Sequence, residues 1–169
     1  IFTVLAAKYR VRRSEKNYNT EIGVPLAILG IPHHGRNIFR WVSALFRVSF
    51  RVLFRADEYP EILVLEIGAD RPGDIAYLSR LAPPICGVIT AIGEIPVHVE
   101  FFAGPEELAR EKAMLIEALP PEGYAVLNFD DETILGIKGR TRGHVFSFGF
   151  GADDYVTKPI QIEQIIQIL

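Results

Sequence analysis

A carboxylate stands where an apolar run typical of a strand ends. Glu66 follows the run 62–65 and precedes a glycine-containing loop. A carboxylate at the carboxyl end of a buried strand can hold Mg²⁺, which prefers oxygen ligands and often bridges to phosphates. The same side chain can equally cap a helix or form an ion pair in a strand–helix loop. From its position alone, both interpretations of Glu66 stay open.

A histidine and a lysine follow further along the chain. His98 lies in the segment 93–104, a long stretch after an apolar run, and functional side chains gather in such loops. Lys112 falls in the helical pattern 104–119, whose leucines already supply an apolar face. Taken one by one, these residues are most simply a surface histidine and a solvated lysine that pairs with an acid of its own helix.

Two polar segments have the composition of nucleotide or sugar sites. Asn128 and Asp131 belong to NFDDE (128–132), which fits a helix N-cap or a contact to adenine or ribose. Asn17, Asn19 and Thr20 precede a helical run whose first turn can receive an anion or a sugar hydroxyl. They are also ordinary turn and cap residues, so the residue types alone favour structural roles.

The elements that must position these residues alternate between strands and helices. Short apolar runs, typical of strands buried on both faces, are 62–68, 85–92, 124–129 and 144–150. Helical patterns are 1–9, 21–29, 37–55, 72–81 and 104–119. This order predicts an α/β fold with a mostly parallel sheet flanked by helices, whose ligands meet the carboxyl ends of the strands.

The whole-chain composition limits the class of protein. A chain of 169 residues has room for one ordinary domain, and 49% hydrophobic residues exclude a disordered chain. The single cysteine, Cys86, excludes an internal disulfide framework, and the net charge of −3 gives no indication of nucleic-acid binding. The chain begins at Ile1 without a signal-peptide pattern and ends in mid-pattern, so we expect a fragment.

The helical pattern 37–55 is basic and amphipathic. On a helical wheel an arc of about 100° contains five arginines, and the apolar face lies opposite it. The arginines are Arg36, Arg40, Arg47, Arg51 and Arg55. Such a helix can lie on an anionic membrane surface, dock a partner, or pack on the sheet with a solvated arginine stripe. Packing, with Phe46 and Leu53 buried, is the favoured prediction, because so broad an exposed apolar face is an aggregation hazard. The pattern is too short and too charged to span a bilayer.

The order of the motifs resembles the central ATPase domain of the Mur ligases. The motifs are NYNTEIGVP (17–25), LVLEIGADRPGDI (63–75), VHVEFFAGPEELAREKAMLIEALPPEG (97–123) and AVLNFDDE (125–132). The resemblance covers residues 1–152 and implies a P-loop-type domain without its N-terminal strand and phosphate loop. The tail 153–169 fits an edge strand or a helix. Among Mur ligases, the motifs are most similar to those of members that join D-alanyl-D-alanine to a UDP-MurNAc-peptide.

The resemblance implies a role for each candidate residue. Glu66 and His98 match residues that bind Mg²⁺. Lys112 matches a lysine that is carbamylated in many members and then serves as a metal ligand, and with His98 it forms the implied catalytic pair. Asn128 and Asp131 match the part of the domain that contacts ATP, and Asn17, Asn19 and Thr20 match the segment beside the UDP-sugar. These roles replace the simpler interpretations of His98 and Lys112, and they imply a cytoplasmic ligase of peptidoglycan precursor synthesis.

The chain also departs from the family pattern. It contains no G-x-x-x-x-G-K-[ST] string, residues 36–58 look like an insertion, and Ala113 and Met114 replace a small–acidic pair. The chain by itself is therefore expected to be inactive. Two alternatives stay open: a non-enzymatic nucleotide-sugar or partner-binding module, and a ligase for another acyl acceptor such as poly-γ-glutamate or folate. The sequence upstream of Ile1 would discriminate between ligase and module.

Overall fold

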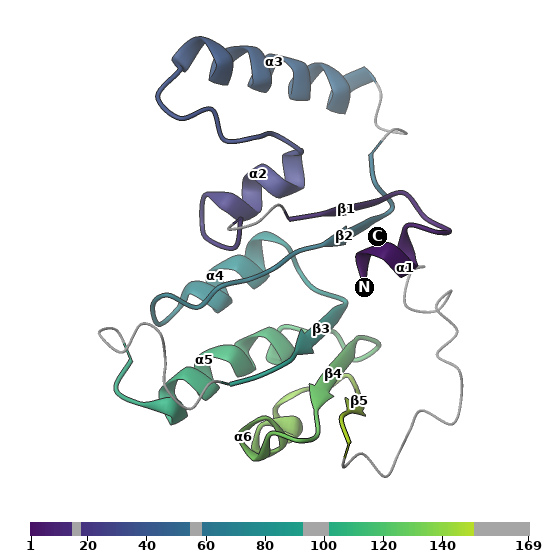
Figure 1. Cartoon of the computed structure of the whole chain (residues 1–169), viewed down its shortest axis with the longest axis vertical. Helices are drawn as coiled ribbons and strands as arrows, with labels where there is room; N and C mark the ends of the chain where they lie inside the picture. The colour runs from purple at the N-terminus through teal and green to yellow at the C-terminus, as the bar shows by residue number, and fades with distance from the viewer. Residues whose placement is uncertain (15–17, 55–58, 93–101, 151–169) are drawn as a thin grey trace. The chain divides into compact units, whose positions relative to one another are not determined.

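The computed structural model describes residues 1–14, 18–54, 59–92 and 102–150 (Figure 1). The chain divides into two compact units, Ile1–Ile67 and a second that begins at Gly68. Asn17, His98 and the tail 153–169 lie outside the described residues.

The first unit combines three helices with a parallel pair of short strands. The helices are α1 (Phe2–Leu5), α2 (Gly23–Leu29) and α3 (Ile38–Phe54). Strand β1 (Val11–Arg13) pairs in parallel with β2 (Ile62–Val64), with Val11 aligned to Ile62. The three predicted helices and the predicted strand at 62–68 are confirmed, although α1 and β2 are shorter than their patterns. Strand β1 was not predicted, because three residues with two arginines carry no strand pattern.

The second unit is a three-stranded parallel sheet with helices in the connections. Its elements are α4 (Asp74–Leu81), β3 (Cys86–Ile89), α5 (Pro105–Glu117), β4 (Tyr124–Asn128), α6 (Glu132–Gly136), the 3-10 turn η2 (Lys138–Arg140) and β5 (His144–Phe148). The strand order is β3-β4-β5, with both pairs parallel. The predicted α/β class with parallel strands and flanking helices is therefore confirmed (Figure 1).

One face of this sheet carries the core of the second unit. Ala125 and Leu127 are buried against α5 and α6, whereas Tyr124 and Val126, which alternate with them, are only half-buried. The prediction of strands buried on both faces is therefore wrong for this unit. A continuous apolar run does not reveal how many faces are covered. Here the buried core residues of the strands, Ile89, Ala125 and Leu127, all lie on one side of the pleat. The core comprises Ile89, Ile92, Phe102, Leu108, Ala109, Ala113, Ile116, Leu119, Ala125, Leu127, Ile134 and Ile137.

Local signals set where α4 and α5 begin. Gly73, with φ of 95°, supplies the left-handed backbone conformation just before α4, which other residues rarely adopt. Helix α5 starts at Pro105, and Glu106 and Glu107 in its first turn suit the positive end of the helix dipole. The Pro120–Pro121 pair follows the end of α5 and prevents its continuation. These signals confirm the predicted starts of both helices.

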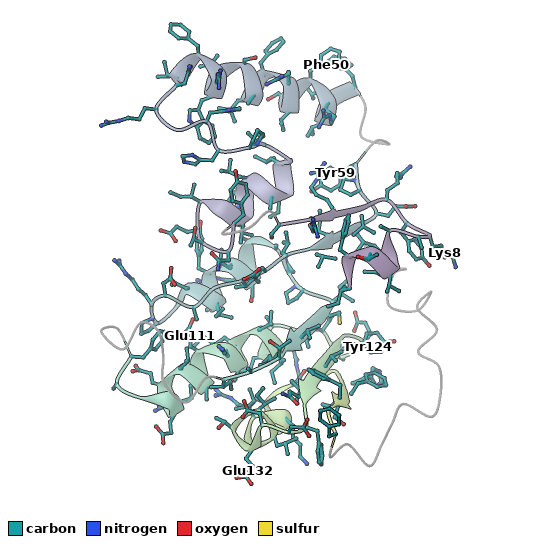
Figure 2. All side chains as sticks on the ribbon, in the orientation of Figure 1. Lys8, Phe50, Tyr59, Glu111, Tyr124 and Glu132 are labelled. Carbon is teal, nitrogen blue, oxygen red and sulfur yellow. The ribbon has the colours of Figure 1, made fainter. Side chains whose placement is uncertain are left out.

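A buried carboxylate joins α4 to α5. Glu111 on α5 is only 3% exposed, and it accepts hydrogen bonds from the backbone N–H groups of Gly73 (2.9 Å) and Ile75 (2.8 Å) (Figure 2). Both N–H groups lie at the start of α4, where a helix leaves its donors unsatisfied. The carboxylate of Glu111 therefore caps one helix from the side of another.

In the described part of the chain, no helix has the length and apolarity needed to cross a membrane.

Candidate functional site

Three successive residues at the carboxyl end of β3 are each held by a side chain from another element. The Nδ2 group of Asn128 donates to the carbonyl of Thr90 (2.9 Å), and Nζ of Lys112 donates to the carbonyl of Ala91 (2.6 Å). The backbone N–H of Ile92 donates to Oδ2 of Asp131 (3.0 Å). The structure thus brings Lys112, Asn128 and Asp131 together around one backbone segment. This is the sheet edge where α/β proteins bind ligands.

Lys112 is not the solvated lysine that its helical pattern alone indicated. It is half-buried, and burial lowers the pKa of its ammonium group, while the charge of Asp131 acts in the opposite direction. A lowered pKa increases the fraction of neutral amine at a given pH. Only the neutral amine has a lone pair that can attack CO₂. The surroundings of Lys112 therefore favour the form that carbamylation requires.

Asp131 forms the N-cap of α6. Its Oδ1 accepts from the N–H groups of Thr133 (3.0 Å) and Ile134 (3.2 Å), in addition to the bond from Ile92 to Oδ2. Burial alone would raise the pKa of Asp131, but these backbone hydrogen bonds outweigh it and lower the pKa. The N-cap interpretation of NFDDE is therefore confirmed. A carboxylate offers about four lone-pair positions, and the Thr133 side chain also hydrogen-bonds Asp131, so its acceptor capacity is largely used within the fold.

Asn128 links the ends of two neighbouring strands. Besides its bond to Thr90, its Oδ1 accepts from the backbone N–H of Asp130 (3.0 Å). The primary amide has two N–H donors and a carbonyl oxygen with two lone pairs. Among the described residues, one N–H and one lone pair of this side chain have no partner, and its orientation is already set. A donor and an acceptor side by side are what an adenine edge can pair with.

Glu66 and the Asn19–Thr20 segment belong to the first unit. Glu66 is exposed two residues after β2, and its backbone N–H donates to Oγ of Ser14 (3.1 Å). It therefore lies at the carboxyl end of its strand, as predicted. Oγ1 of Thr20 accepts from the N–H of Gly23 (3.4 Å) at the start of α2, and Asn19 is half-buried. Thr20 is thus a turn residue just before α2, whose N-cap is Ile22.

Of the three predicted metal ligands, only Lys112 is a described residue of the second unit. His98 lies outside the described residues, and Glu66 belongs to the other unit. Within the described ranges, no three histidine, cysteine or carboxylate side chains gather as a metal site would require. The metal roles of Glu66, His98 and Lys112 stay predictions.

Sequence reasoning missed Glu111, the neighbour of Lys112. A signal was present, since residue 111 follows Leu108 by three positions and precedes Leu115 by four. That spacing places the carboxylate on the apolar stripe of α5, where an acid must find donors. The donors come from α4, a partner that the pattern of α5 cannot identify. Lys112 therefore lies on a helix, α5, that Glu111 connects to α4 through hydrogen bonds.

Replacing Asp131 is expected to destabilise the second unit in a pH-dependent way. Asp131→Ala should cost about 1–2 kcal/mol at neutral pH, because an N-cap acceptor is lost. The folded-state pKa lies below the ordinary value, so this stabilisation is complete above the unfolded pKa and disappears as the pH falls through the folded pKa. Urea titrations followed by circular dichroism at neutral and acidic pH measure both effects. Asp131→Asn, which keeps a capping oxygen, should cost less and should flatten the acid dependence. An equal loss for both variants at every pH would contradict this account.

Comparisons with known proteins agree with this architecture. The model of the Mur ligase middle domain matches residues 48–166. The UDP-N-acetylmuramoyl-tripeptide–D-alanyl-D-alanine ligase of Bacillus subtilis is 33% identical over 135 residues, which are 80% of this chain and 23% of that protein. The enzyme of the same name from Mycobacterium leprae is 33% identical over 107 residues, 63% of this chain and 20% of that protein. The chain thus spans between a fifth and a quarter of the length of these curated relatives.

Solved structures show the same fold. The MurF ligase of Thermotoga maritima, crystallised in complex with ADP, superposes with a TM-score of 0.65 and 31% identity, over 88% of this chain and 28% of that one. MurF from Acinetobacter baumannii gives a TM-score of 0.66 at 23% identity, over 88% of this chain and 27% of that one, which is a likeness of fold. The family match covers more than half of the chain. This chain therefore belongs to the Mur ligase family and carries its middle domain.

Proposed function

We propose that this chain is part of an ATP-dependent ligase that joins D-alanyl-D-alanine to a UDP-MurNAc-tripeptide during peptidoglycan precursor synthesis. The names of the Bacillus subtilis and Mycobacterium leprae relatives support the substrates. The observation that carries the proposal is the half-buried Lys112, with its lowered pKa, beside Asn128 and Asp131 at the end of β3. We infer a cytoplasmic location, because ATP is the phosphoryl donor.

The proposed reaction has two balanced steps. The terminal carboxylate of the peptide attacks the γ-phosphorus of ATP, and the bond to ADP breaks, which gives an acyl phosphate and ADP. The amine of D-alanyl-D-alanine then adds to the acyl carbon to form a tetrahedral intermediate. The carbon–oxygen bond to phosphate breaks, a proton leaves the nitrogen, and the products are an amide and inorganic phosphate. Without activation of the carboxylate, amide formation in water is unfavourable.

Lys112 would act as a carbamate. Its neutral amine forms a nitrogen–carbon bond to CO₂ and releases a proton, which converts a cationic side chain into an anion with two oxygen donors. The donor chemistry fits Mg²⁺, because the exposed carboxylate of Glu66 and a Lys112 carbamate are hard oxygen ligands, and His98 adds an imidazole. When bound, Mg²⁺ neutralises charge that develops on the transferred phosphoryl group. Lys112 and His98 are the residues that we assign to catalysis.

The remaining candidate residues would bind the two larger substrates. Asn128 offers one N–H and one lone pair to the base of ATP, and Asp131 fixes the backbone of Ile92 beside it. The ADP bound to the Thermotoga maritima relative supports the proposal that this domain binds a nucleotide. Asn17, Asn19 and Thr20 would contact the UDP-sugar near the start of α2.

The test is a ligase assay on the full-length gene product that carries residues 1–169. Release of ADP and phosphate should require UDP-MurNAc-tripeptide and D-alanyl-D-alanine together, and the product should gain the mass of the dipeptide. Poly-γ-glutamate and folate substrates serve as matched controls for other acyl acceptors. Phosphate release with one of those acceptors, or binding of the UDP-sugar without turnover, would refute the proposal.

Residues 1–169 by themselves are expected to bind ATP weakly. They contain no glycine-rich phosphate-loop string, and such a loop supplies most backbone N–H donors to the β- and γ-phosphates. We expect a dissociation constant on the order of millimolar, equivalent to about −4 kcal/mol. Isothermal titration calorimetry with ATP measures it. A micromolar constant would mean that this chain has a phosphate site of another kind.

A further inference from the structure

Helix α3 exposes most of its apolar side chains. Nine large apolar residues of α3 are between 51% and 85% exposed, and they are Ile38, Phe39, Val42, Leu45, Phe46, Phe50, Val52, Leu53 and Phe54. Phe50 is labelled on this helix in Figure 2. The prediction that Phe46 and Leu53 are buried is therefore wrong. The helical pattern was correct, but periodicity alone does not decide which side of an amphipathic helix finds a partner.

A narrow edge attaches α3 to the rest of the first unit. Ala44 is buried against Leu26 and Ile31, and Trp41 and Val48 pack beside it. Nε1 of Trp41 also donates to the carbonyl of Gly35 (3.0 Å). At about 100° per residue, these contacts occupy roughly 60° of the helix, and the exposed apolar residues cover roughly 200°. The exposed arc is wider than the stripe of about 100° that a surface helix commonly buries in a protein core.

The charge on α3 has one sign. Arg40, Arg47 and Arg51 are exposed, and the sequence IFRWVSALFRVSFRVLF contains no acid. The three arginines lie within about 40° of arc, between the exposed apolar arc and the packed edge. Arginine can bury its aliphatic stem along an apolar surface while its guanidinium stays in water. The helix therefore presents an apolar face bordered by a cationic stripe.

We propose that α3 lies in the headgroup region of an anionic membrane, with the apolar arc immersed and the arginines at the lipid phosphates. A helix half-immersed in an interface buries about half of its circumference, which matches the width of the exposed arc. Charge complementarity favours an anionic surface. It also disfavours a second copy of this chain, because two α3 helices would bring like charges together. A helix of 17 residues is about 26 Å long, and it lies along the surface rather than across it.

Vesicle co-sedimentation of the full chain tests this proposal. We expect binding to phosphatidylcholine vesicles that contain phosphatidylglycerol, weak binding to phosphatidylcholine alone, and release by salt. Arg40→Gln/Arg47→Gln/Arg51→Gln should weaken binding roughly 100-fold, since each arginine near the surface contributes independently. Arg80→Gln/Arg110→Gln/Arg142→Gln, which removes the same charge from exposed positions of the second unit, should bind as the unmodified chain does.

The double variant Trp41→Phe/Phe46→Trp moves the single tryptophan of the chain from the packed edge of α3 to its exposed apolar arc, where it reports the position of the helix without a label. Vesicles with brominated acyl chains should quench its emission. Equal loss of binding in both triple variants, or binding without quenching of the tryptophan at position 46, would overturn the proposal. So would binding that ignores the anionic lipid. Dimers that are seen in sedimentation velocity and that Phe46→Ser dissociates would overturn it in favour of a second copy of this chain. Binding of an acidic protein to α3, without binding of the chain to vesicles, would overturn it in favour of a protein partner.

Discussion

Lys112→Met should lower ligase turnover by about three orders of magnitude in the full-length gene product, a loss typical of removing a group that stabilises transition-state charge. The structure places Nζ of Lys112 half-buried against the carbonyl of Ala91, with a pKa lowered by burial. Methionine keeps the length and the packing of the side chain but cannot form a carbamate. The measurement is phosphate release under saturating substrates, with circular dichroism to verify the fold.

Two controls separate a carbamate from a simple cation at Lys112. Lys112→Arg keeps the positive charge and should be as inactive as Lys112→Met, because a guanidinium does not react with CO₂. Lys112→Ala should regain part of its activity with added acetate, since a small carboxylate can occupy the place of the carbamate. Full activity of Lys112→Arg would show that charge alone is needed, and it would refute carbamylation.

The pH dependence follows from the direction of the pKa shift. The pKa of Lys112 is lowered, so the neutral amine becomes populated at a lower pH than for an exposed lysine. Incorporation of isotopically labelled bicarbonate into the side chain should therefore rise with pH from neutral to mildly alkaline conditions. Nuclear magnetic resonance of the labelled carbon measures it, and Lys112→Arg provides the blank.

Glu111→Ala should destabilise the second unit by about 3–5 kcal/mol, because a hydrogen bond to a charged group is worth about 1.5–3 kcal/mol and two are lost. The carboxylate is 3% exposed and accepts from Gly73 and Ile75. Alanine would leave both N–H groups without this acceptor, and that of Ile75 is buried away from water. Urea denaturation followed by circular dichroism measures the loss.

Matched variants distinguish the buried cap from a general effect of removing an acid. Glu111→Gln retains one acceptor oxygen and turns a donor toward the second N–H group, so it should cost about half as much as Glu111→Ala. Glu122→Ala removes an exposed acid of the α5–β4 connection and should change stability by less than about 0.5 kcal/mol. Similar losses for Glu111→Ala and Glu122→Ala would show that the two bonds contribute little.

Most elements could be predicted from local pattern because their causes are local. Helix α5 has a proline and two acids at its start and a proline pair after its end, and the apolar runs of β3, β4 and β5 have the length of strands. Strand β1 could not be predicted, since what makes Val11–Arg13 a strand is its pairing with β2, about fifty residues away. The number of covered sheet faces depends equally on distant partners.

The candidate site also combines features that depend on local sequence with features that depend on tertiary contacts. The sequence by itself determined the parallel α/β class, the order of the Mur ligase motifs and the residue types at the strand ends, because these depend on neighbours along the chain. Only the tertiary structure decided that Lys112 is half-buried beside Asn128 and Asp131, that Glu111 caps another helix, and that α3 leaves its apolar face exposed. Burial and pKa shifts arise from atoms that meet through folding, and periodicity states which side of a helix is apolar but not what covers it.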